Sequence, residues 1–265
     1  MTTISDRIQL AGDLLRRSRW TAVLTGAGVG TESGLPDFRS TPVPGGTGGL
    51  WTGIDPMRVA SASAFARDPD AFYRFYQQRL SHLAGAEPNP AHQAIARLEA
   101  LGLVQLVITQ NVDRLHQEAG SRHVVEVHGN LREARCQRCG KVVPIGEMTT
   151  QLEAGDRPRC AECGDLLRPN VVLFEELLPA EAYDRGAAAC LRCETLLVVG
   201  SSLEVYPVAG LPQLAKEHGA KVVMVNREPT ARDHLADVRL QGQAGEILPA
   251  LVEAVQRAAA SRRPR

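Results

Sequence analysis

The stretch Gly26–Arg39, GAGVGTESGLPDFR, decides how the chain is interpreted, because it joins a glycine-rich turn to a polar cluster. It follows the apolar run Ala22–Leu24, which predicts a buried strand. The glycines therefore fall where a strand gives way to a helix, and free backbone N–H groups at such a turn can bind phosphate. Thr31 stands where the dinucleotide fingerprint G-x-G-x-x-G has its third glycine, so the glycines alone indicate a nucleotide site only weakly.

Outward from this turn, apolar runs rich in β-branched residues alternate with helical patterns, which predicts an α/β fold with a doubly wound parallel sheet. The expected strands are Ala22–Leu24, Val104–Ile108, Val124–Val127, Val171–Phe174, Leu196–Val199 and Val222–Val225. The expected helices are the N-terminal segment, Ala91–Ala100, Asp113–Ala119, Ala180–Arg192, Leu211–His218 and Ile247–Ala259. Polar clusters follow the strands at 26–28, 109–111, 200–202 and Asn226, and ligands bind such sheets at the carboxyl ends of strands. We therefore expect four strand ends to line one crevice.

Four cysteines have the spacing of a zinc ribbon. Cys136-x-x-Cys139 is followed twenty residues later by Cys160-x-x-Cys163, and a glycine follows each pair. Four thiolates complete a tetrahedral zinc shell with no open position, so the predicted metal is structural. Two disulfides or free thiols are the alternative, and a reducing compartment disfavours disulfides. We do not predict a metal at Cys190-x-x-Cys193, because no second cysteine pair is left to complete the site. We expect these two residues to be buried core cysteines in a helix.

Composition limits the kinds of partner. The 265 residues carry 30 Lys+Arg and 30 Asp+Glu, so no global field would draw nucleic acid or an anionic membrane. The N-terminus lacks the apolar core of a signal peptide, and no run approaches the ~18 apolar residues of a membrane span. We expect a soluble, cytoplasmic monomer that contacts neither membranes nor nucleic acid directly.

Two segments break the strand–helix alternation. Trp51–Ala86 is helical and aromatic, and Arg132–Arg168 holds the four cysteines among Gly, Pro and charged residues. We expect these inserts to form a second, smaller domain.

Further motifs make a family resemblance visible. They are TQNVDRLH at 109–116, EVHG at 126–129, RPNVVLF at 168–174, GSSLEVYP at 200–207 and VNREPT at 225–230. Together with GAGVGTESGLPDFR and the cysteines, they resemble the sirtuins, the NAD-dependent protein-lysine deacylases, in the order of that family. The likeness runs from about residue 20 to 250 and points to a bacterial member.

The resemblance implies a Rossmann-like domain with a discontinuous zinc domain, and NAD bound between them. The implied boundaries are 1–40, 90–130 and 170–257 for the NAD-binding domain, 41–89 and 131–169 for the small helical and zinc-ribbon domain, and 258–265 for a flexible tail. The implied reaction transfers the acyl group of an acylated lysine in a protein or peptide, releasing nicotinamide and O-acyl-ADP-ribose. His128 would be the general base, a role suited to a group that titrates near neutral pH.

Other roles follow from the resemblance residue by residue. Asn111 would share in catalysis, and Phe174 and Val205 would contact the substrate backbone. His92 would be structural and His116 supporting. The implied NAD contacts are Gly26, Ala27, Gly28, Asp37, Phe38, Arg39, Gln110, Asn111, Val112, Asp113, Gly200, Ser201, Ser202, Asn226, Arg227, Glu228 and Ala244.

Tyr76-x-x-Arg79 resembles the pair by which class III, desuccinylase-type sirtuins hold a dicarboxylic acyl group. A guanidinium fork and a phenol suit a carboxylate. The alternative is that Tyr76 packs in an aromatic stripe and Arg79 is a solvated charge.

The chain departs from the family pattern twice. Gly30 replaces the serine usual after GAGx, and Glu175 replaces the glycine of the Phe-Gly-Glu motif. If the second position needs a positive φ, the glutamate is strained. Protein ADP-ribosyl transfer on the same fold and an NAD(P)-linked oxidoreductase remain alternative functions, but the latter would need the full glycine fingerprint. A non-catalytic zinc-ribbon binding module is a third alternative.

Overall fold

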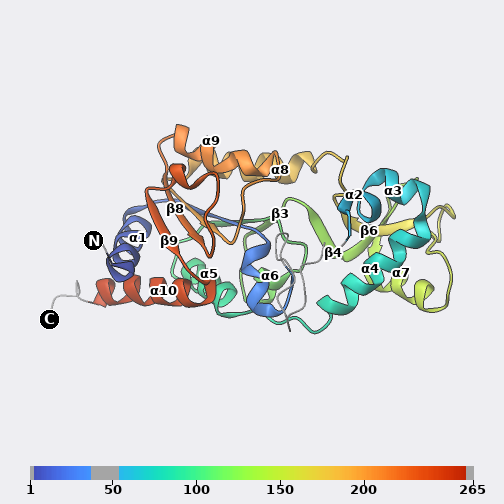
Figure 1. The fold of residues 1–265 in the computed structure, drawn as a ribbon, viewed down its shortest axis with the longest axis horizontal. Coiled ribbons are helices and arrows are strands. Elements are labelled where there is room, and N and C mark those ends of the chain that lie inside the picture. Colours follow the sequence, from blue (N-terminus) through green and yellow to red (C-terminus); the bar gives the residue numbers. More distant parts are fainter. Residues whose placement is uncertain (1–2, 37–53, 261–265) are drawn as a thin grey trace.

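The computed structural model describes residues 3–36 and 54–260 (Figure 1). Asp37, Phe38 and Arg39, which the resemblance places at the cofactor, lie outside these ranges, as do residues 261–265 of the expected tail. Helix α10 (Ala244–Ala260) enters the range expected as tail. None of the helices in the described ranges combines the length and apolarity that a membrane crossing requires.

A six-stranded parallel sheet forms the larger part of the molecule. Its strands lie in the order β3 (Val124–Glu126), β2 (Leu106–Thr109), β1 (Thr21–Thr25), β7 (Thr195–Val199), β8 (Lys221–Asn226) and β9 (Val238–Gln241). The chain leaves β1 toward β2 on one side and later leaves β7 toward β8 on the other. The strand order therefore switches between β1 and β7, the position where such sheets bind ligands.

Helices cover both faces of this sheet (Figure 1). One apolar cluster contains residues of α1 (Ile4–Arg17), α5 (Pro90–Ala100) and α10, and a second contains residues of α8 (Ala180–Arg192) and α9 (Leu211–Glu217). Every residue of β1 and β7 is buried, as expected for central strands covered on both faces. The predicted doubly wound α/β fold is confirmed.

A smaller sheet lies beside the large one. Strands β5 (Val142–Pro144), β4 (Gly129–Cys136) and β6 (Leu167–Val171) pair antiparallel in that order. Around them lie α2 (Pro56–Val59), α3 (Ala62–Arg67), α4 (Pro69–Leu83) and α7 (Ile145–Glu153), and one apolar cluster unites α4 with the sheet. A small domain is thus present, as predicted.

One expected strand was wrong, and one strand of the large sheet was missed. The segment Val171–Phe174 does not belong to the parallel sheet, because its first residue ends β6 and pairs with Gly129 of the small sheet. Strand β9 was not predicted, because this edge strand is short and only its alternate residues Val238 and Leu240 are buried. Helix α6 (Leu115–Glu118) is shorter than expected, and single 3-10 turns cover Ala27–Val29, Thr31–Ser33, Val208–Gly210 and Asp233–Leu235.

Candidate active site

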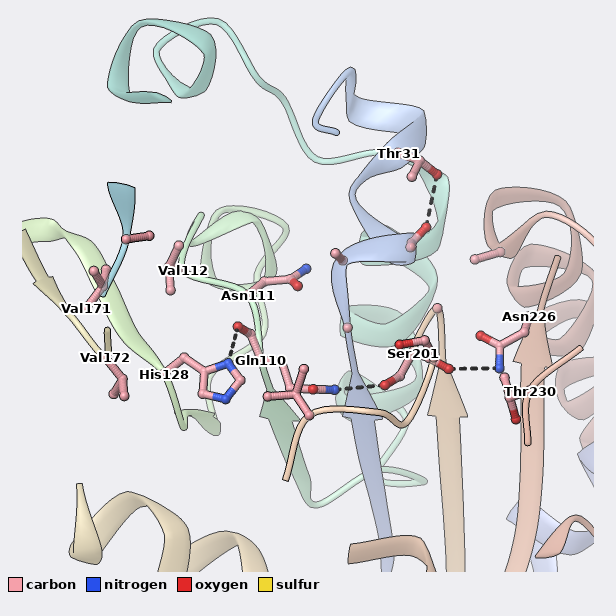
Figure 2. Close-up of a pocket in the computed structure, with 18 of the residues that line it drawn as sticks. Thr31, Gln110, Asn111, Val112, His128, Val171, Val172, Ser201, Asn226 and Thr230 are labelled. Carbon is pink, nitrogen blue, oxygen red and sulfur yellow. Dashed lines mark hydrogen bonds between the residues drawn. The ribbon is translucent and has the colours of Figure 1, made fainter. Parts of the chain in front are cut away.

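A cavity of about 760 Å³ opens at the carboxyl ends of the parallel strands (Figure 2). Its walls come from the turns after β1, β2, β7 and β8, from the segment after β6, and from α4. All the described residues expected at the cofactor line it except Asp113, namely Gly26, Ala27, Gly28, Gln110, Asn111, Val112, Gly200, Ser201, Ser202, Asn226, Arg227, Glu228 and Ala244. His128, Tyr76, Arg79, Phe174 and Val205 line it as well. The expected crevice of four strand ends is therefore present.

The glycine turn packs against the end of β7. The Gly28 N–H donates to the Gly200 carbonyl at 2.8 Å, and a Cβ at Gly28 would lie 2.8 Å from that oxygen. Gly200 has a φ of +59°, and a Cβ there would lie 2.4 Å from the Val29 nitrogen. These glycines are required because two backbones touch. The expectation of free N–H groups fails at Gly28 and at Gly26, whose N–H donates to the Val199 carbonyl.

Polar side chains form a continuous row across the floor of the cavity. Gln110 donates from Nε2 to the Ser201 Oγ at 2.9 Å, and Asn226 donates from Nδ2 to the Ser201 carbonyl at 3.1 Å (Figure 2). Gln110 and Ser201 follow β2 and β7, and Asn226 is the last residue of β8. The row therefore connects three strand ends across the topological switch point.

His128 stands at the boundary between the two sheets. Its Nδ1 lies 3.0 Å from the Gln110 carbonyl, which can only accept, so Nδ1 carries the proton (Figure 2). In the neutral ring, Nε2 then keeps its lone pair. Burial holds the pKa of His128 below its ordinary value of 6.5, although the bond to the carbonyl opposes this effect. At neutral pH the imidazole is therefore uncharged and can accept a proton.

Asn111 supplies an unused donor to the cavity. The residue is 8% exposed, and its Nδ2 has no hydrogen-bond partner among the described residues. A buried amide without a partner is costly unless a ligand satisfies it. An elongated, hydroxyl-rich ligand such as NAD fits a cavity of this volume with such a donor and the polar floor beside it.

Asp113 is the exception among the expected cofactor residues. Its Oδ1 accepts the Leu115 N–H at 2.9 Å, at the start of α6, and its side chain is not among those that line the cavity. Burial raises the pKa of Asp113 to about 6.

Tyr76 and Arg79 share one wall of the cavity. The guanidinium carbon of Arg79 lies 5.9 Å from the centroid of the Tyr76 ring. Tyr76 is buried, its ring centroid lies 4.5 Å from that of Phe72, and burial raises the pKa of its phenol. Tyr76 is thus both part of an aromatic cluster and part of the cavity wall.

Several residues that line the cavity were not predicted from the sequence. Gly242 and Gln243 follow β9 and could not be placed without that strand. Glu32 accepts the Gly245 N–H at 2.7 Å and so ties the glycine loop to α10. Thr31, which occupies the position of the missing third glycine, donates to the Gly28 carbonyl at 3.0 Å.

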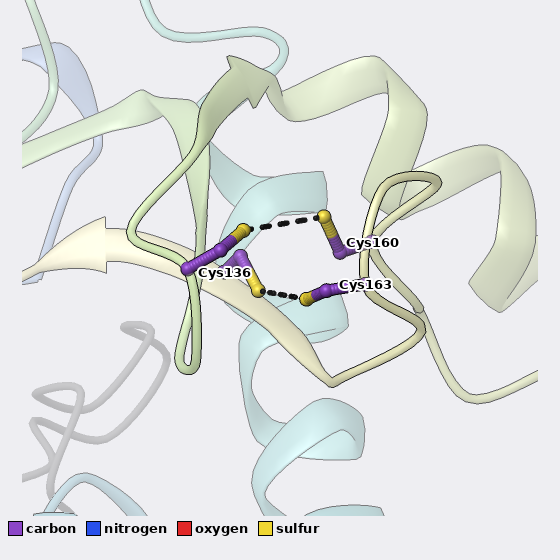
Figure 3. A group of neighbouring side chains, drawn as sticks. Cys136, Cys160 and Cys163 are labelled. Carbon is purple, nitrogen blue, oxygen red and sulfur yellow. Dashed lines mark hydrogen bonds between the residues drawn. The ribbon is translucent and has the colours of Figure 1, made fainter.

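The four cysteines of the small domain converge (Figure 3). Their sulfur atoms all lie within 4.8 Å of one another, with 3.4 Å between Cys136 and Cys163 and 3.7 Å between Cys139 and Cys160. These distances are too long for S–S bonds and close to the ~3.8 Å between ligands in a tetrahedral zinc–sulfur shell. The site fits one structural zinc. Cys190 and Cys193 are buried at the end of α8, where burial raises their pKa values to about 12 and 11.

Proteins of similar sequence share one named activity. The chain is 46% identical over 255 residues to "NAD-dependent protein deacylase 2" of Archaeoglobus fulgidus, covering 96% of this chain and 98% of that protein. It is 50% identical over 245 residues to "NAD-dependent protein deacylase 2" of Pyrobaculum aerophilum, covering 92% and 94%.

Solved structures agree with this likeness. A structure described as "Structural Basis for the Mechanism and Regulation of Sir2 Enzymes" matches with a TM-score of 0.85 at 45% identity, over 96% of this chain and 99% of that one. Another, "Sir2-p53 peptide-NAD+", matches with a TM-score of 0.82 at 40% identity, over 91% and 95%. The model of the Sir2 family matches residues 26–207. The chain belongs to the Sir2 family, the sirtuins.

Proposed function

We propose that this chain is an NAD-dependent protein-lysine deacylase. The observation that carries the proposal is the neutral His128, which holds its proton on Nδ1 and keeps a free Nε2 in a cavity that fits NAD. The names of the relatives and the peptide and NAD+ in the structure of similar fold support it. An NAD(P)-linked oxidoreductase has no such support.

His128 is the general base of the proposed reaction. When bound, NAD would supply a ribose carbon as the acceptor of the acyl oxygen and nicotinamide as the leaving group. With one water consumed, the final products would be the free lysine, nicotinamide and O-acyl-ADP-ribose. His128 takes a proton at Nε2 from a ribose hydroxyl. The Gln110 carbonyl fixes the ring and stabilises the resulting imidazolium, while the Asn111 amide donates within the same part of the cavity.

We assign NAD to the floor and the two glycine-lined walls. The turns at Gly26–Gly28 and Gly200–Ser202 take the phosphates and the adjoining ribose, Asn226–Glu228 and Ala244 take the adenosine, and Gln110–Val112 take the nicotinamide ribose. We retain Asp113 near the nicotinamide end, where its carboxylate acts through the start of α6 instead of lining the cavity. The expected roles of Asp37, Phe38 and Arg39 remain predictions.

The acylated peptide is assigned to the segment after β6. Phe174 and Val205 both line the cavity, and the segments that carry them would pair with an extended chain. The backbone groups of Phe174 itself are already used, because its N–H donates to the Ala60 carbonyl at 3.0 Å and its carbonyl accepts the Ala62 N–H at 3.1 Å. The peptide therefore has to pair beyond this contact.

For the acyl group we propose that Arg79 and Tyr76 read a dicarboxylic chain such as succinyl, as in class III members. The support is that both side chains line the cavity and that Arg79 forms no ion pair with another residue in the described part of the chain. A terminal carboxylate would supply one.

The setting of the protein also remains a proposal. A site of four thiolates requires reduced cysteines and so favours a reducing compartment such as the cytoplasm. The balanced charge favours neither nucleic acid nor membranes as partners. We further propose a monomer. The relatives named above are from archaea, and a bacterial source remains a prediction from the resemblance.

The decisive experiment incubates the protein with NAD and a panel of acetyl-, succinyl- and longer acyl-lysine peptides, and follows the products by mass spectrometry. We expect free nicotinamide and O-acyl-ADP-ribose in equal amounts. His128→Ala should abolish both, by roughly 10²-fold or more, while leaving the melting temperature close to that of the parent. Reduced cofactor or ADP-ribosylated protein in place of deacylated peptide would contradict the proposal.

A further inference from the structure

A buried imidazole lies behind the cavity without touching it. His116, in α6, is 1% exposed, and its Nε2 lies 2.9 Å from the Oγ1 of Thr25, the last residue of β1. Thr25 Oγ1 lies 2.8 Å from the Oγ1 of Thr109, the last residue of β2, and this second hydroxyl accepts the Asn111 N–H at 3.1 Å. Three hydrogen bonds thus connect His116 to the backbone of Asn111.

The direction of these bonds follows from the donors available. Thr109 Oγ1 accepts the Asn111 N–H and the hydroxyl proton of Thr25. Because the Thr25 hydroxyl donates its hydrogen to Thr109, its oxygen can only accept from His116. The His116 proton therefore belongs on Nε2. Each step is then a donor meeting an acceptor. The two bonds from His116 to Thr109 run in one direction and polarise each other, and the Asn111 N–H meets them at the Thr109 oxygen.

A second histidine is consistent with this arrangement. The His92 ring lies edge-to-face with the His116 ring, with centroids 4.9 Å apart. His92 Nδ1 accepts the Asn89 N–H at 3.4 Å, which places the His92 proton on Nε2. The two ring nitrogens without a partner among the described residues are His92 Nε2, a donor, and His116 Nδ1, an acceptor. Burial keeps both rings uncharged, with pKa values of about 4 for His92 and 3 for His116.

The same group of residues also touches the glycine loop. Asn89 donates from Nδ2 to the Val29 carbonyl at 2.7 Å and to the Ser33 hydroxyl at 3.0 Å. Its side-chain oxygen caps the start of α5. The polar core behind the cavity therefore contacts the wall that follows β1 as well as the turn that follows β2.

We propose that His116 is a positioning residue for Asn111. By donating from Nε2 through the hydroxyls of Thr25 and Thr109, it holds the backbone of Asn111 and so places the unpartnered Asn111 amide against the nicotinamide ribose. The inference rests on the proposed function only in the identity of that ligand. His116 itself touches neither the ligand nor the reacting atoms.

The test compares two substitutions at one buried site. His116→Gln keeps an amide N–H near the position of Nε2, whereas His116→Leu fills similar space without a donor. We expect His116→Leu to lower kcat for deacylation roughly tenfold, with a smaller change in the KM for NAD, because a small misplacement of a reacting group is costly. His116→Gln should retain most of kcat.

Further variants separate this role from packing. Thr25→Val removes the middle hydroxyl and should reproduce the effect of His116→Leu, and the double variant should be little worse than either single one, because all three break the same chain. Thr195→Val, in a buried threonine of β7 that does not line the cavity, is the matched control and should leave kcat unchanged. Rates are compared at equal folded fraction, measured by circular dichroism.

Three results would overturn the inference: full kcat in His116→Leu, equal losses in the Leu and Gln variants, or additive losses in the double variant. Calorimetric binding of NAD to each variant gives a second readout that needs no turnover. If the parent binds NAD but deacylates no peptide, the proposed function fails. The positioning role is then judged on the affinity for NAD. It stands if His116→Leu lowers that affinity and His116→Gln does not, and it fails if the two variants bind NAD equally well.

Discussion

The two sheets of this molecule are stabilised in different ways. The six-stranded sheet lies between two apolar clusters, and most of its side chains are covered on both faces. The three-stranded sheet shares one cluster with α4 and α7, and two of the four cysteines, Cys136 and Cys160, belong to that cluster. The large sheet can therefore rely on burial of hydrocarbon, whereas the small one has a core that includes its metal ligands.

This difference indicates which side of the cavity can change without disturbing the other. The cavity takes its floor from the large sheet and one wall from the small domain, through Tyr76, Arg79 and the residues after β6. A change that loosens the small domain should alter the substrate side while the nucleotide side persists. The following predictions test that separation, beginning with the largest expected effect.

Removal of the metal should separate the two sheets most clearly. Treatment with a strong chelator, or Cys136→Ala, should abolish amide-exchange protection in β4, β5 and β6, because structural zinc contributes directly to folding. Protection in β1, β7 and β8 should persist. Deacylation should fall to background. Hydrogen-exchange mass spectrometry measures both regions in one sample.

Cys193→Ala is the matched control, since Cys193 is equally buried but belongs to the core of the large sheet. It should cost about 1 kcal/mol without loss of metal. If the small sheet kept normal amide-exchange protection in metal-free protein, its stability would not depend on the metal, and the two sheets would not differ in this way.

Arg79→Met should change the acyl preference without loss of the nucleotide site. We expect turnover of succinyl-lysine to fall by roughly tenfold to a hundredfold, because its carboxylate would lose the guanidinium proposed to bind it, while acetyl-lysine turnover is kept. Steady-state kinetics on two peptides that differ only in the acyl group give the ratio. Arg74→Met, an exposed residue on the same helix, is the control. Equal losses of turnover on both peptides would show that Arg79 has a structural role and does not recognise the acyl group.

Asp113→Asn tests an ionisable group on the large-sheet side. The folded-state pKa of about 6 lies above the ordinary value, so the folded chain binds more protons than the unfolded chain between about pH 4 and 6. Stability of the parent is therefore lost as the pH rises through this range. The free energy of unfolding of the variant should match that of the parent near pH 4 and exceed it at pH 7 by up to about 3 kcal/mol. A pH-independent difference would show that Asp113 does not titrate in this range.

Glu175 gives the smallest expected effect and bears on how the small domain holds α3. Its φ is +76°, so the expected strain is present, but its carboxylate accepts the Ser63 N–H at 2.8 Å and the Ser63 hydroxyl at 2.9 Å. Glu175→Gly relieves about 1 kcal/mol of strain and loses two bonds of about 1 kcal/mol each. It should therefore change stability by no more than about 1 kcal/mol.

Glu175→Ala keeps the strain and loses the same bonds, so it should be the less stable of the two variants by about 1 kcal/mol. Thermal melting of the pair is sufficient. If the alanine variant matched the glycine variant, backbone strain at this position would be negligible.

The sequence predicted the parts of this structure that depend on local pattern. Strands β1, β7 and β8 are apolar throughout their centres, and the zinc spacing is fixed within two short turns. The assignment of Val171–Phe174 failed because an apolar run does not say which sheet it joins, and β6 follows from pairing with β4, over thirty residues away. The link from His116 to Asn111 likewise depends on two threonines on neighbouring strands, which no spacing in the sequence brings together.

The polar floor of the cavity also fixes what each part of it can still bind. Gln110 uses its amide nitrogen on Ser201 and on the Thr25 carbonyl, so only its oxygen remains, and an oxygen can be matched only by a ligand hydroxyl or N–H. Ser201 Oγ accepts from Gln110 and from the Leu203 N–H, which leaves its proton for an oxygen of the ligand. The end of β2 thus presents an acceptor and the end of β7 a donor. A ribose hydroxyl would match the acceptor and a phosphate oxygen the donor, so the floor favours one orientation of a bound nucleotide.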